Sequence, residues 1–231
     1  MKIAQISPLI ESVPPRLYGG TARIVSYLTE ALVAQGHDVT LFASGDSITS
    51  AKLYPCCDEA LRLKRSVLDP IPYHLGMLDL VKLHAHEFDV LHFHIDQFHF
   101  HIFNRTNFRT VTTVHGRQDL NDLHRLYRSF PAMPLVSISN AQRTPIPSAN
   151  FVATVQYGLP TDLLPPTFQP RGGYLAFWGR ISPEKRVDRA IEIARVLAHD
   201  RDVEGGAVLD QHRAPGLQLQ AMRHDARDGV A

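Results

Sequence analysis

Near its start the chain has two apolar runs separated by a glycine-bearing loop and an amphipathic segment, an order that few folds accommodate. Residues 2–7 (KIAQIS) form a short apolar run typical of a buried strand, and residues 14–20 (PPRLYGG) form a loop rich in proline and glycine. Apolar positions in residues 21–36 recur at helical spacing, and residues 37–44 (HDVTLFAS) are predicted to be a second strand. Strand, helix and strand in this order predict one βαβ unit of a parallel sheet.

The same alternation continues for about another hundred residues. A helix is predicted over residues 75–86. Four further segments carry the β-branched, aromatic and apolar residues typical of strands: residues 88–94, 109–115, 135–139 and 151–156. We therefore predict an α/β fold, a Rossmann-like doubly wound parallel sheet that forms an N-terminal domain over residues 1–159.

The sequence changes character after this predicted domain. Residues 160–173 are dense in proline and glycine and are predicted to be an interdomain linker. Residues 174–198 then repeat the pattern of strand, Gly-containing turn and helix, with Ser182 as the expected N-cap and Pro183 in the first turn. We interpret this segment as the start of a second, incomplete Rossmann-like domain.

The last segment, residues 199–231, is rich in Asp, Arg, His and Gly and lacks sustained apolar periodicity. We expect it to be poorly ordered. One hypothesis is that it arises from a shifted reading frame or a premature truncation, which sequencing of the gene would test.

Composition excludes several classes of partner. Lys and Arg number 24 and Asp and Glu 23, so the formal charge of +1 gives no reason to expect nucleic acid or an anionic membrane as the main partner. No run approaches the roughly 18 apolar residues of a membrane-spanning helix. Cys56 and Cys57 are adjacent and cannot form a disulfide scaffold. A cytoplasmic location and the absence of a transmembrane segment are therefore expected.

Gly19, Gly20 and Thr21 lie where the first loop meets the first helix, and we predict that they bind substrate. Ligands of such sheets bind at the carboxyl ends of strands, where glycine admits close approach and a helix N-terminus attracts phosphate or carboxylate. Thr21 is also the expected N-cap. The spacing is not that of a dinucleotide fingerprint, and the alternative is that the glycines only form a turn.

Histidines form a second group of candidates. His115, followed by Gly116, comes at the end of a predicted strand, where an imidazole faces the cleft and can hydrogen-bond a sugar hydroxyl or phosphate; the alternative is a structural histidine. We assign His115 a catalytic role and His94 and Gly116 a substrate-binding role.

A metal site is a further alternative for the histidine-rich stretch His92, His94, His99 and His101. Cysteine and carboxylate partners are not arranged around it, so we predict no metal.

The segment WGRISPEKR provides two cations, Arg180 and Lys185, at a predicted junction of strand and helix. Two cations there would neutralise a leaving diphosphate without a metal ion, and we predict that both are catalytic. The alternative is a solvated helix start.

These pieces together resemble glycosyltransferase family 4, whose members have the two-domain GT-B fold. The resemblance extends to about residue 194 and is carried by KIAQISP, YGGTARIVSYLTEALVAQGHDVTLFASGDS, FDVLHFH, TVHG, LVSISNAQR and GRISPEKRVDRAIEIA. It implies transfer of a sugar from a nucleotide-diphosphate sugar to an acceptor hydroxyl, usually with retention, and no other cofactor. It further implies that Arg180 and Lys185 contact the diphosphate and that His115 lies near the transferred sugar.

The chain departs from the family's pattern in its last part. The resemblance implies a Glu-x7-Glu element for the donor, a Gly-rich loop before it and a closing helix, and this chain ends before any of them could occur in that context. We therefore expect a C-terminally truncated chain with little or no activity. A non-catalytic module that binds a sugar or a phosphate is one alternative. A different Rossmann-like protein, such as an epimerase or a dehydrogenase, is another, against which the missing dinucleotide fingerprint and the GRISPEKR segment count.

Overall fold

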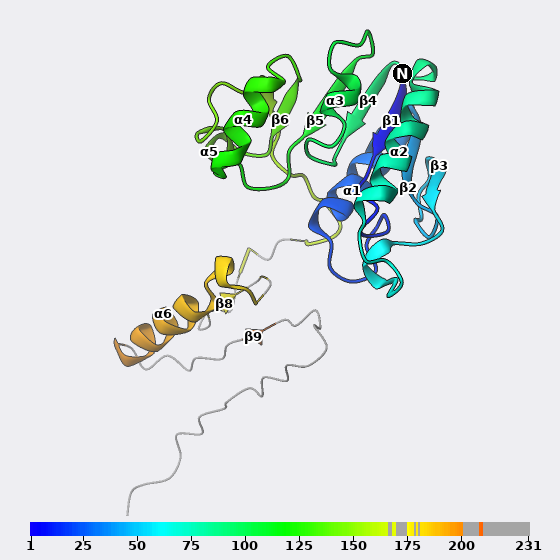
Figure 1. Cartoon of the computed structure of the whole chain (residues 1–231). Helices are drawn as coiled ribbons and strands as arrows, with labels where there is room; N and C mark the ends of the chain where they lie inside the picture. Colours follow the sequence, from blue (N-terminus) through cyan, green and yellow to red (C-terminus); the bar gives the residue numbers. More distant parts are fainter. Residues whose placement is uncertain (166–167, 170–174, 178, 180, 201–207, 210–231) are drawn as a thin grey trace, which may run out of the picture. The chain divides into compact units, whose positions relative to one another are not determined.

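The chain folds into two compact units, Met1–Leu164 and Pro165–Ala231, and each is described by itself. This computed structural model describes residues 1–165, 168–169, 175–177, 179, 181–200 and 208–209 (Figure 1). The predicted N-terminal domain ended at residue 159, within the first unit. Most of the predicted tail, residues 201–207 and 210–231, lies outside the described residues.

The first unit is built on one parallel sheet of seven strands in the order β3-β2-β1-β4-β5-β6-β7. The strands are β1 Lys2–Ile6, β2 Asp38–Ser44, β3 Lys52–Cys57, β4 Val90–Phe93, β5 Thr110–Thr113, β6 Leu135–Ser137 and β7 Phe151–Thr154. The order reverses between β1 and β4, which is the topological switch point of a doubly wound sheet. The prediction of a Rossmann-like doubly wound parallel sheet is therefore confirmed.

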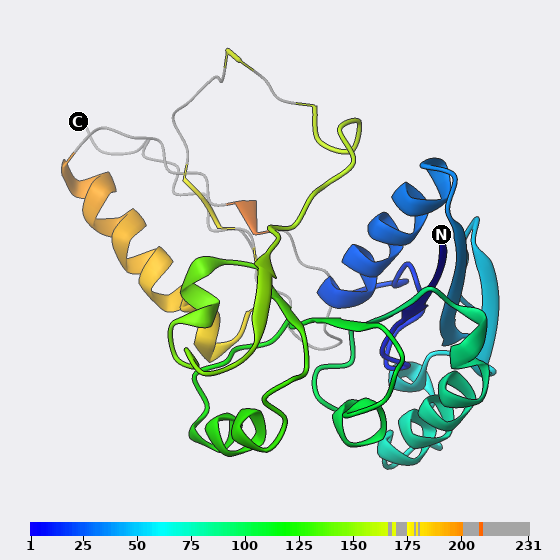
Figure 2. The ribbon, with the colours of Figure 1, turned by 90° about the horizontal axis from the view of Figure 1, so that it is seen from above.

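Helices cover both faces of this sheet. The α-helices of the first unit are α1 Gly20–Ala34, α2 Ile71–His84, α3 Phe100–Phe103, α4 Asn121–Ser129 and α5 Asn140–Arg143. Viewed from above, α1 lies on one face and α2 and α4 lie on the other (Figure 2). The change of face follows from the switch point, because a right-handed crossover in the opposite direction along the sheet places its helix on the opposite side.

Alternation along the strands divides the core between the two faces. On β2, Phe42 packs in a cluster with Met77 and Leu78 of α2, whereas Leu41 and Ala43 pack with α1. A third cluster lies under α4 and the β5–β7 end of the sheet. Because successive side chains of a strand point to opposite faces, one apolar strand supplies both layers.

Two local predictions in the first unit are corrected. Thr21 is not the N-cap of the first helix, because α1 begins at Gly20 and its cap position is Gly19, which has no side chain to offer. The sequence analysis also missed β3, which contains Pro55. Proline cannot donate to a sheet ladder and argues against a strand, but β3 is an edge strand, where a missing donor is tolerated.

The second unit contains a two-stranded parallel sheet, β8 Ala176–Phe177 and β9 Val208–Leu209, and the helix α6 Val187–Asp200. The predicted helix beginning at Ser182 is interrupted. Residues Pro183–Lys185 form one 3₁₀ turn, and Arg186 has a φ of 51°, in the left-handed region, which breaks the helical hydrogen-bond ladder before α6 starts.

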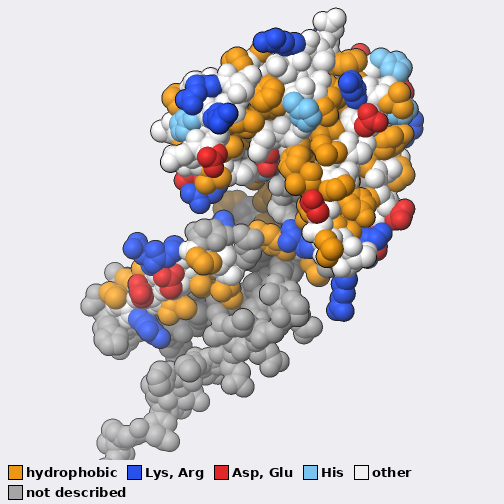
Figure 3. All heavy atoms as spheres, viewed as in Figure 1, with side chains coloured by type: hydrophobic (Ala, Val, Ile, Leu, Met, Phe, Trp, Pro, Cys, Tyr) orange, Lys and Arg blue, Asp and Glu red, His pale blue; other side chains and the backbone are white. Residues whose placement is uncertain are grey.

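Charged side chains of both signs are interspersed over the face of the first unit seen in Figure 3, without a single large basic patch there. Both cysteines are free thiols. Across the described residues, none of the helices combines the length and the apolar character that crossing a bilayer requires.

Candidate functional site

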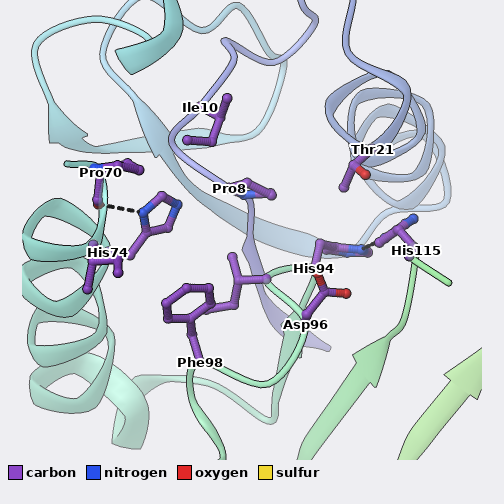
Figure 4. A pocket seen from close by; sticks show the side chains of 12 residues that line it. Pro8, Ile10, Thr21, Pro70, His74, His94, Asp96, Phe98 and His115 are labelled. Atoms are coloured by element: carbon purple, nitrogen blue, oxygen red, sulfur yellow. Dashed lines mark hydrogen bonds between the residues drawn. The ribbon is translucent and has the colours of Figure 1, made fainter. Parts of the chain in front are cut away.

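A pocket of about 400 Å³ opens in the first unit at the carboxyl ends of β1 and β4, the switch point of the sheet. Two sides of it differ in chemistry (Figure 4). Thr21, His94, Asp96 and His115 lie on one side, and Pro70, His74 and Phe98 lie on the other. Open sheets of this kind bind ligands at this position, so the pocket is the candidate site.

The histidines at this site result from strand alternation. On β4, Leu91 and Phe93 enter the core under α2, so His92 and, just past the strand end, His94 face the opposite side of the sheet. Gln5 of β1, which is fully buried, pairs in register with His92 and faces the same side. Gln5, His92 and His94 thus form a polar row on the face of the sheet that α1 covers.

A chain of hydrogen bonds runs from this row to the pocket. Nε2 of His94 is 2.7 Å from Oε1 of Gln5, and Nδ1 of His94 is 2.9 Å from Nε2 of His115. Nδ1 of His115 is in turn 2.7 Å from the hydroxyl of Tyr157. The amide of Gln5 also reaches Nδ1 of His92 at 3.4 Å.

The direction of these bonds follows from the carbonyl oxygen of Gln5, which only accepts. His94 donates from Nε2 to that oxygen, and its Nδ1 then accepts from Nε2–H of His115. Nδ1 of His115 is left to accept the O–H of Tyr157. Every ring nitrogen of His94 and His115 therefore has a partner within the protein.

Burial keeps these imidazoles neutral. Desolvation lowers the pKa of His115 to about 4, and desolvation with the nearby His115 lowers the pKa of His92 to about 4. The pKa of the completely buried His94 lies well below its ordinary value for the same reason, with His92 and His115 adding to the effect. At neutral pH the row is an uncharged hydrogen-bonding frame that fixes the orientation of His115.

Asp96 is the acidic group of the pocket. It follows β4 with a φ of 50°, in the left-handed region that Asp tolerates better than most residues. Its Oδ1 is buried and has no hydrogen-bond partner among the described residues. Desolvation raises the pKa of the Asp96 carboxyl, and the backbone N–H of His115 opposes that shift. Asp96 thus brings to the pocket a carboxyl group with one oxygen whose hydrogen-bonding capacity is unused among the described residues.

The glycine loop stands at the edge of this site. Thr21 and Gly116 line the pocket, whereas Gly19 and Gly20 are not among its lining residues. A Cβ on Gly19 would lie 2.8 Å from Cβ of Pro15, so Gly19 is required for packing of the loop. A Cβ on Gly20 would meet nothing within 4 Å.

The two predicted cations belong to the second unit. Arg180 lies outside the described residues. Lys185 ends the 3₁₀ turn, and its side chain is exposed. Their predicted contact with a diphosphate stays a prediction.

The four histidines of the metal alternative do not converge. His92 and His94 share one face of the sheet, while His99 is buried on the other face, stacked on Phe93 and bonded to Thr112. His101 is exposed on α3. Within the part of the chain that the structure describes, no group of three or more His, Cys, Asp or Glu side chains is arranged to hold a metal ion.

Three residues of the site were missed by the sequence analysis. Gln5 is the polar residue inside the first apolar run, and Asp96 follows the strand that ends in His94. Both could have been found from the sequence: Gln5 is a polar residue within a predicted buried strand, and Asp96 is a carboxylate at the carboxyl end of a strand. Tyr157 could not, because its approach to His115 depends on the path of the chain after β7.

Comparison with known proteins agrees with this architecture. The family model described as Glycosyltransferase Family 4 matches residues 18–155. No curated protein matches the chain significantly. Among solved structures, AviGT4, a glycosyltransferase involved in avilamycin A biosynthesis, is similar at 20% identity and a TM-score of 0.59, covering 89% of this chain and 55% of that one.

Two further solved structures are similar. Sucrose-phosphate synthase from Thermosynechococcus elongatus has 16% identity and a TM-score of 0.61, covering 94% of this chain and 64% of that one. A glycosyltransferase from Rickettsia africae has 14% identity and a TM-score of 0.56, covering 89% and 59% respectively. At these identities the likeness establishes the fold. The chain spans 55 to 64% of the length of these three structures.

Proposed function

Because the chain belongs to glycosyltransferase family 4, we propose that the protein transfers a sugar from a nucleotide-diphosphate sugar to an acceptor hydroxyl, with retention at the anomeric carbon. The observation that carries the proposal is the pocket at the switch point, into which His115 is held by its bonds to His94 and Tyr157. A site with a fixed hydrogen-bonding group and an unpartnered acceptor suits a ligand rich in hydroxyls.

In this proposal the first unit binds the acceptor and the transferred sugar. Thr21, His94 and Gly116 line the site, and the N-terminus of α1 at Gly19 and Gly20, which are not among the pocket's lining residues, favours an anionic group beside the pocket. His115 is the group closest to the transferred sugar. A sugar hydroxyl that takes the place of the Tyr157 hydroxyl would find Nδ1 of His115 free to accept its proton.

The second unit would stabilise the leaving group. Arg180 and Lys185 are proposed to neutralise the negative charge that develops on the diphosphate as its bond to the anomeric carbon breaks, in place of a metal ion. For Lys185 the support is its exposed position next to α6. For Arg180 it is the sequence segment alone.

A non-catalytic sugar-binding or phosphate-binding module is the second candidate. It is favoured by one observation: the described residues that line the pocket all lie between Pro8 and Gly116, within the first unit. Such a pocket could bind a ligand without a contribution from the second unit.

The test is release of nucleoside diphosphate from a panel of nucleotide-sugars, with and without a panel of hydroxyl acceptors, combined with calorimetric titration of the donor. Release that depends on an acceptor supports transfer, and sugar binding without any release supports the second candidate. Lys185→Ala should weaken donor binding about tenfold or more, the usual effect of losing a charged hydrogen bond. Arg195→Ala, which removes an exposed cation from the same unit, is the matched control.

His115→Ala separates the two units' roles. We expect it to reduce turnover by a larger factor than donor affinity, since His115 lies in the first unit and is proposed to contact the transferred sugar but not the diphosphate. Equal loss of donor affinity in Lys185→Ala and Arg195→Ala would contradict the role given to Lys185. Unchanged turnover in His115→Ala would contradict the role given to His115.

A further inference from the structure

The pocket of the first unit carries a charge pattern that restricts its ligand. Among the described residues that line it, none is Lys or Arg. Its titratable side chains are His74, His94, His115 and Asp96. The described part of the pocket therefore contains one carboxylate and three imidazoles, without a permanent cation.

The imidazoles do not supply a positive charge. Nε2 of His74 accepts the backbone N–H of Leu9 at 3.1 Å, and its Nδ1 donates to the carbonyl of Pro70 at 2.8 Å. One nitrogen of His74 is thus an acceptor, which requires the neutral ring. His94 and His115 are likewise neutral acceptors at Nδ1 within their chain of bonds. Burial lowers the pKa of all three rings.

An anionic ligand would be unfavourable in these surroundings. A phosphate or carboxylate entering the pocket would lose water and find no charged Lys or Arg side chain among the described lining residues, while Asp96 repels it. A hydroxyl is favoured instead. The carboxyl group of Asp96 lines the pocket, and its Oδ1 has no partner among the described residues, so the group has unused capacity to accept an O–H from a ligand.

The remaining walls suit the carbon skeleton of a small ring. Pro8, Ile10 and Ile95 provide apolar surface, and the ring of Phe98 lies across from Asp96 (Figure 4). The volume of about 400 Å³ is at the small end of the range for ligand pockets. The aromatic ring and the aliphatic walls suit the C–H face of a sugar. The few polar groups suit its hydroxyl edge.

We propose that this pocket binds an uncharged monosaccharide unit, that Asp96 accepts a hydrogen bond from one of its hydroxyls, and that sugars bearing phosphate or carboxylate are discriminated against. The inference rests on the proposed function in one respect, that the ligand is a sugar. What is new is that the sugar is uncharged and that Asp96 is the residue that selects for it.

The experiment is calorimetric titration of the full 231-residue chain with neutral hexoses and N-acetylhexosamines, and with hexose 6-phosphates and hexuronates. We expect at least one neutral sugar to bind in the millimolar range and its charged counterpart to bind at least about tenfold more weakly. Absence of binding by every neutral sugar at tens of millimolar overturns the proposal, as does tighter binding of a sugar phosphate.

Asp96→Asn tests the named residue, because Asn also tolerates the left-handed backbone conformation. It should weaken binding of the neutral sugar about tenfold, the usual loss for a hydrogen bond to a charged group. Asp119→Asn is the matched control, since Asp119 is an exposed carboxylate of the same unit paired with Arg117. Equal affinities in the two variants would overturn the role of Asp96.

A second variant keeps the proposal testable if Asp96→Asn does not fold. Ile71→Lys places an ammonium group at a half-exposed position of the pocket wall. It should raise the affinity for a hexose 6-phosphate about tenfold while the neutral sugar still binds; no change for the phosphate would count against the charge argument.

Nucleoside diphosphate release, measured on the same preparations, separates the two proposals. Neutral-sugar binding without turnover refutes only the transferase activity. Turnover with a phosphorylated acceptor that is lost in Asp96→Asn would show that this acceptor uses the pocket. That result refutes only the proposal that the pocket takes uncharged sugars.

Discussion

Acidification should unfold the first unit well before its carboxylates are all protonated, because several of its histidines are buried as neutral rings. Burial lowers the pKa of His92 and His115 to about 4, and burial with the neighbouring His101 lowers that of His99 to about 3. A group whose pKa is lower in the folded state stabilises the fold fully above its unfolded pKa, about 6.5 for His, and less as the pH falls below that value.

The magnitude follows from the same shifts. Going from pH 7.5 to pH 5, each of these three histidines should lower the free energy of unfolding by about 2 kcal/mol, or about 6 kcal/mol together. His94 acts in the same direction. Asp96, whose pKa is raised by burial, has the opposite sign and offsets part of the loss. Because domains are stable by only about 5–15 kcal/mol, a loss of this size brings the unit near its unfolding midpoint.

The assay is urea unfolding followed by circular dichroism at half-unit steps between pH 7.5 and 4.5. Between pH 6.5 and 4, each neutral buried histidine contributes a slope of about 1.4 kcal/mol per pH unit. His115→Gln keeps a neutral hydrogen-bonding group but does not titrate, so it should reduce the slope by about 1.4 kcal/mol per pH unit, the contribution of one proton. His86→Gln, at an exposed position, should leave it unchanged. A free energy of unfolding that stays level between pH 7 and pH 5 refutes the reasoning.

Three further predictions concern stability and reactivity. Gly19→Ala should destabilise the fold by about 1–3 kcal/mol, because its Cβ would lie 2.8 Å from Pro15, whereas Gly20→Ala, with open space around it, should not; equal melting temperatures would contradict this. Leu78→Ala should lower the free energy of unfolding by about 2–5 kcal/mol in denaturant titration, since Leu78 of α2 is fully buried in the core. Burial raises the pKa of the Cys56 thiol to about 12, so iodoacetamide at pH 8 should alkylate it about a thousandfold more slowly than in urea.

The sheet was predictable because its signal is local. An apolar run such as residues 88–94 shows by itself that a strand is present, and the two-residue spacing of His92 and His94 places both on one face. Segments with a contrary local signal were missed. Pro55 concealed β3, and the polar sequence of α4, in which only Tyr127 is buried, concealed that helix.

The candidate site was predictable only in part, because its chemistry depends on register. His94, His115, Thr21 and Gly116 were found by their positions next to strand ends and the first loop. The link between His92 and His94 through Gln5 exists because β1 pairs with β4 in one particular register, which no local pattern specifies.

The interior position of β1 in the sheet has a consequence for biosynthesis. β1 pairs with β2 on one side, but its other neighbour, β4, contributes Val90 opposite Ile3 and is synthesised 87 residues later. At roughly 5–20 residues per second, the ribosome needs roughly 4–17 s to make that partner. During this interval one hydrogen-bonding edge of β1 has no partner in the nascent chain, so slow translation between β2 and β4 would prolong the period in which self-association can compete with folding.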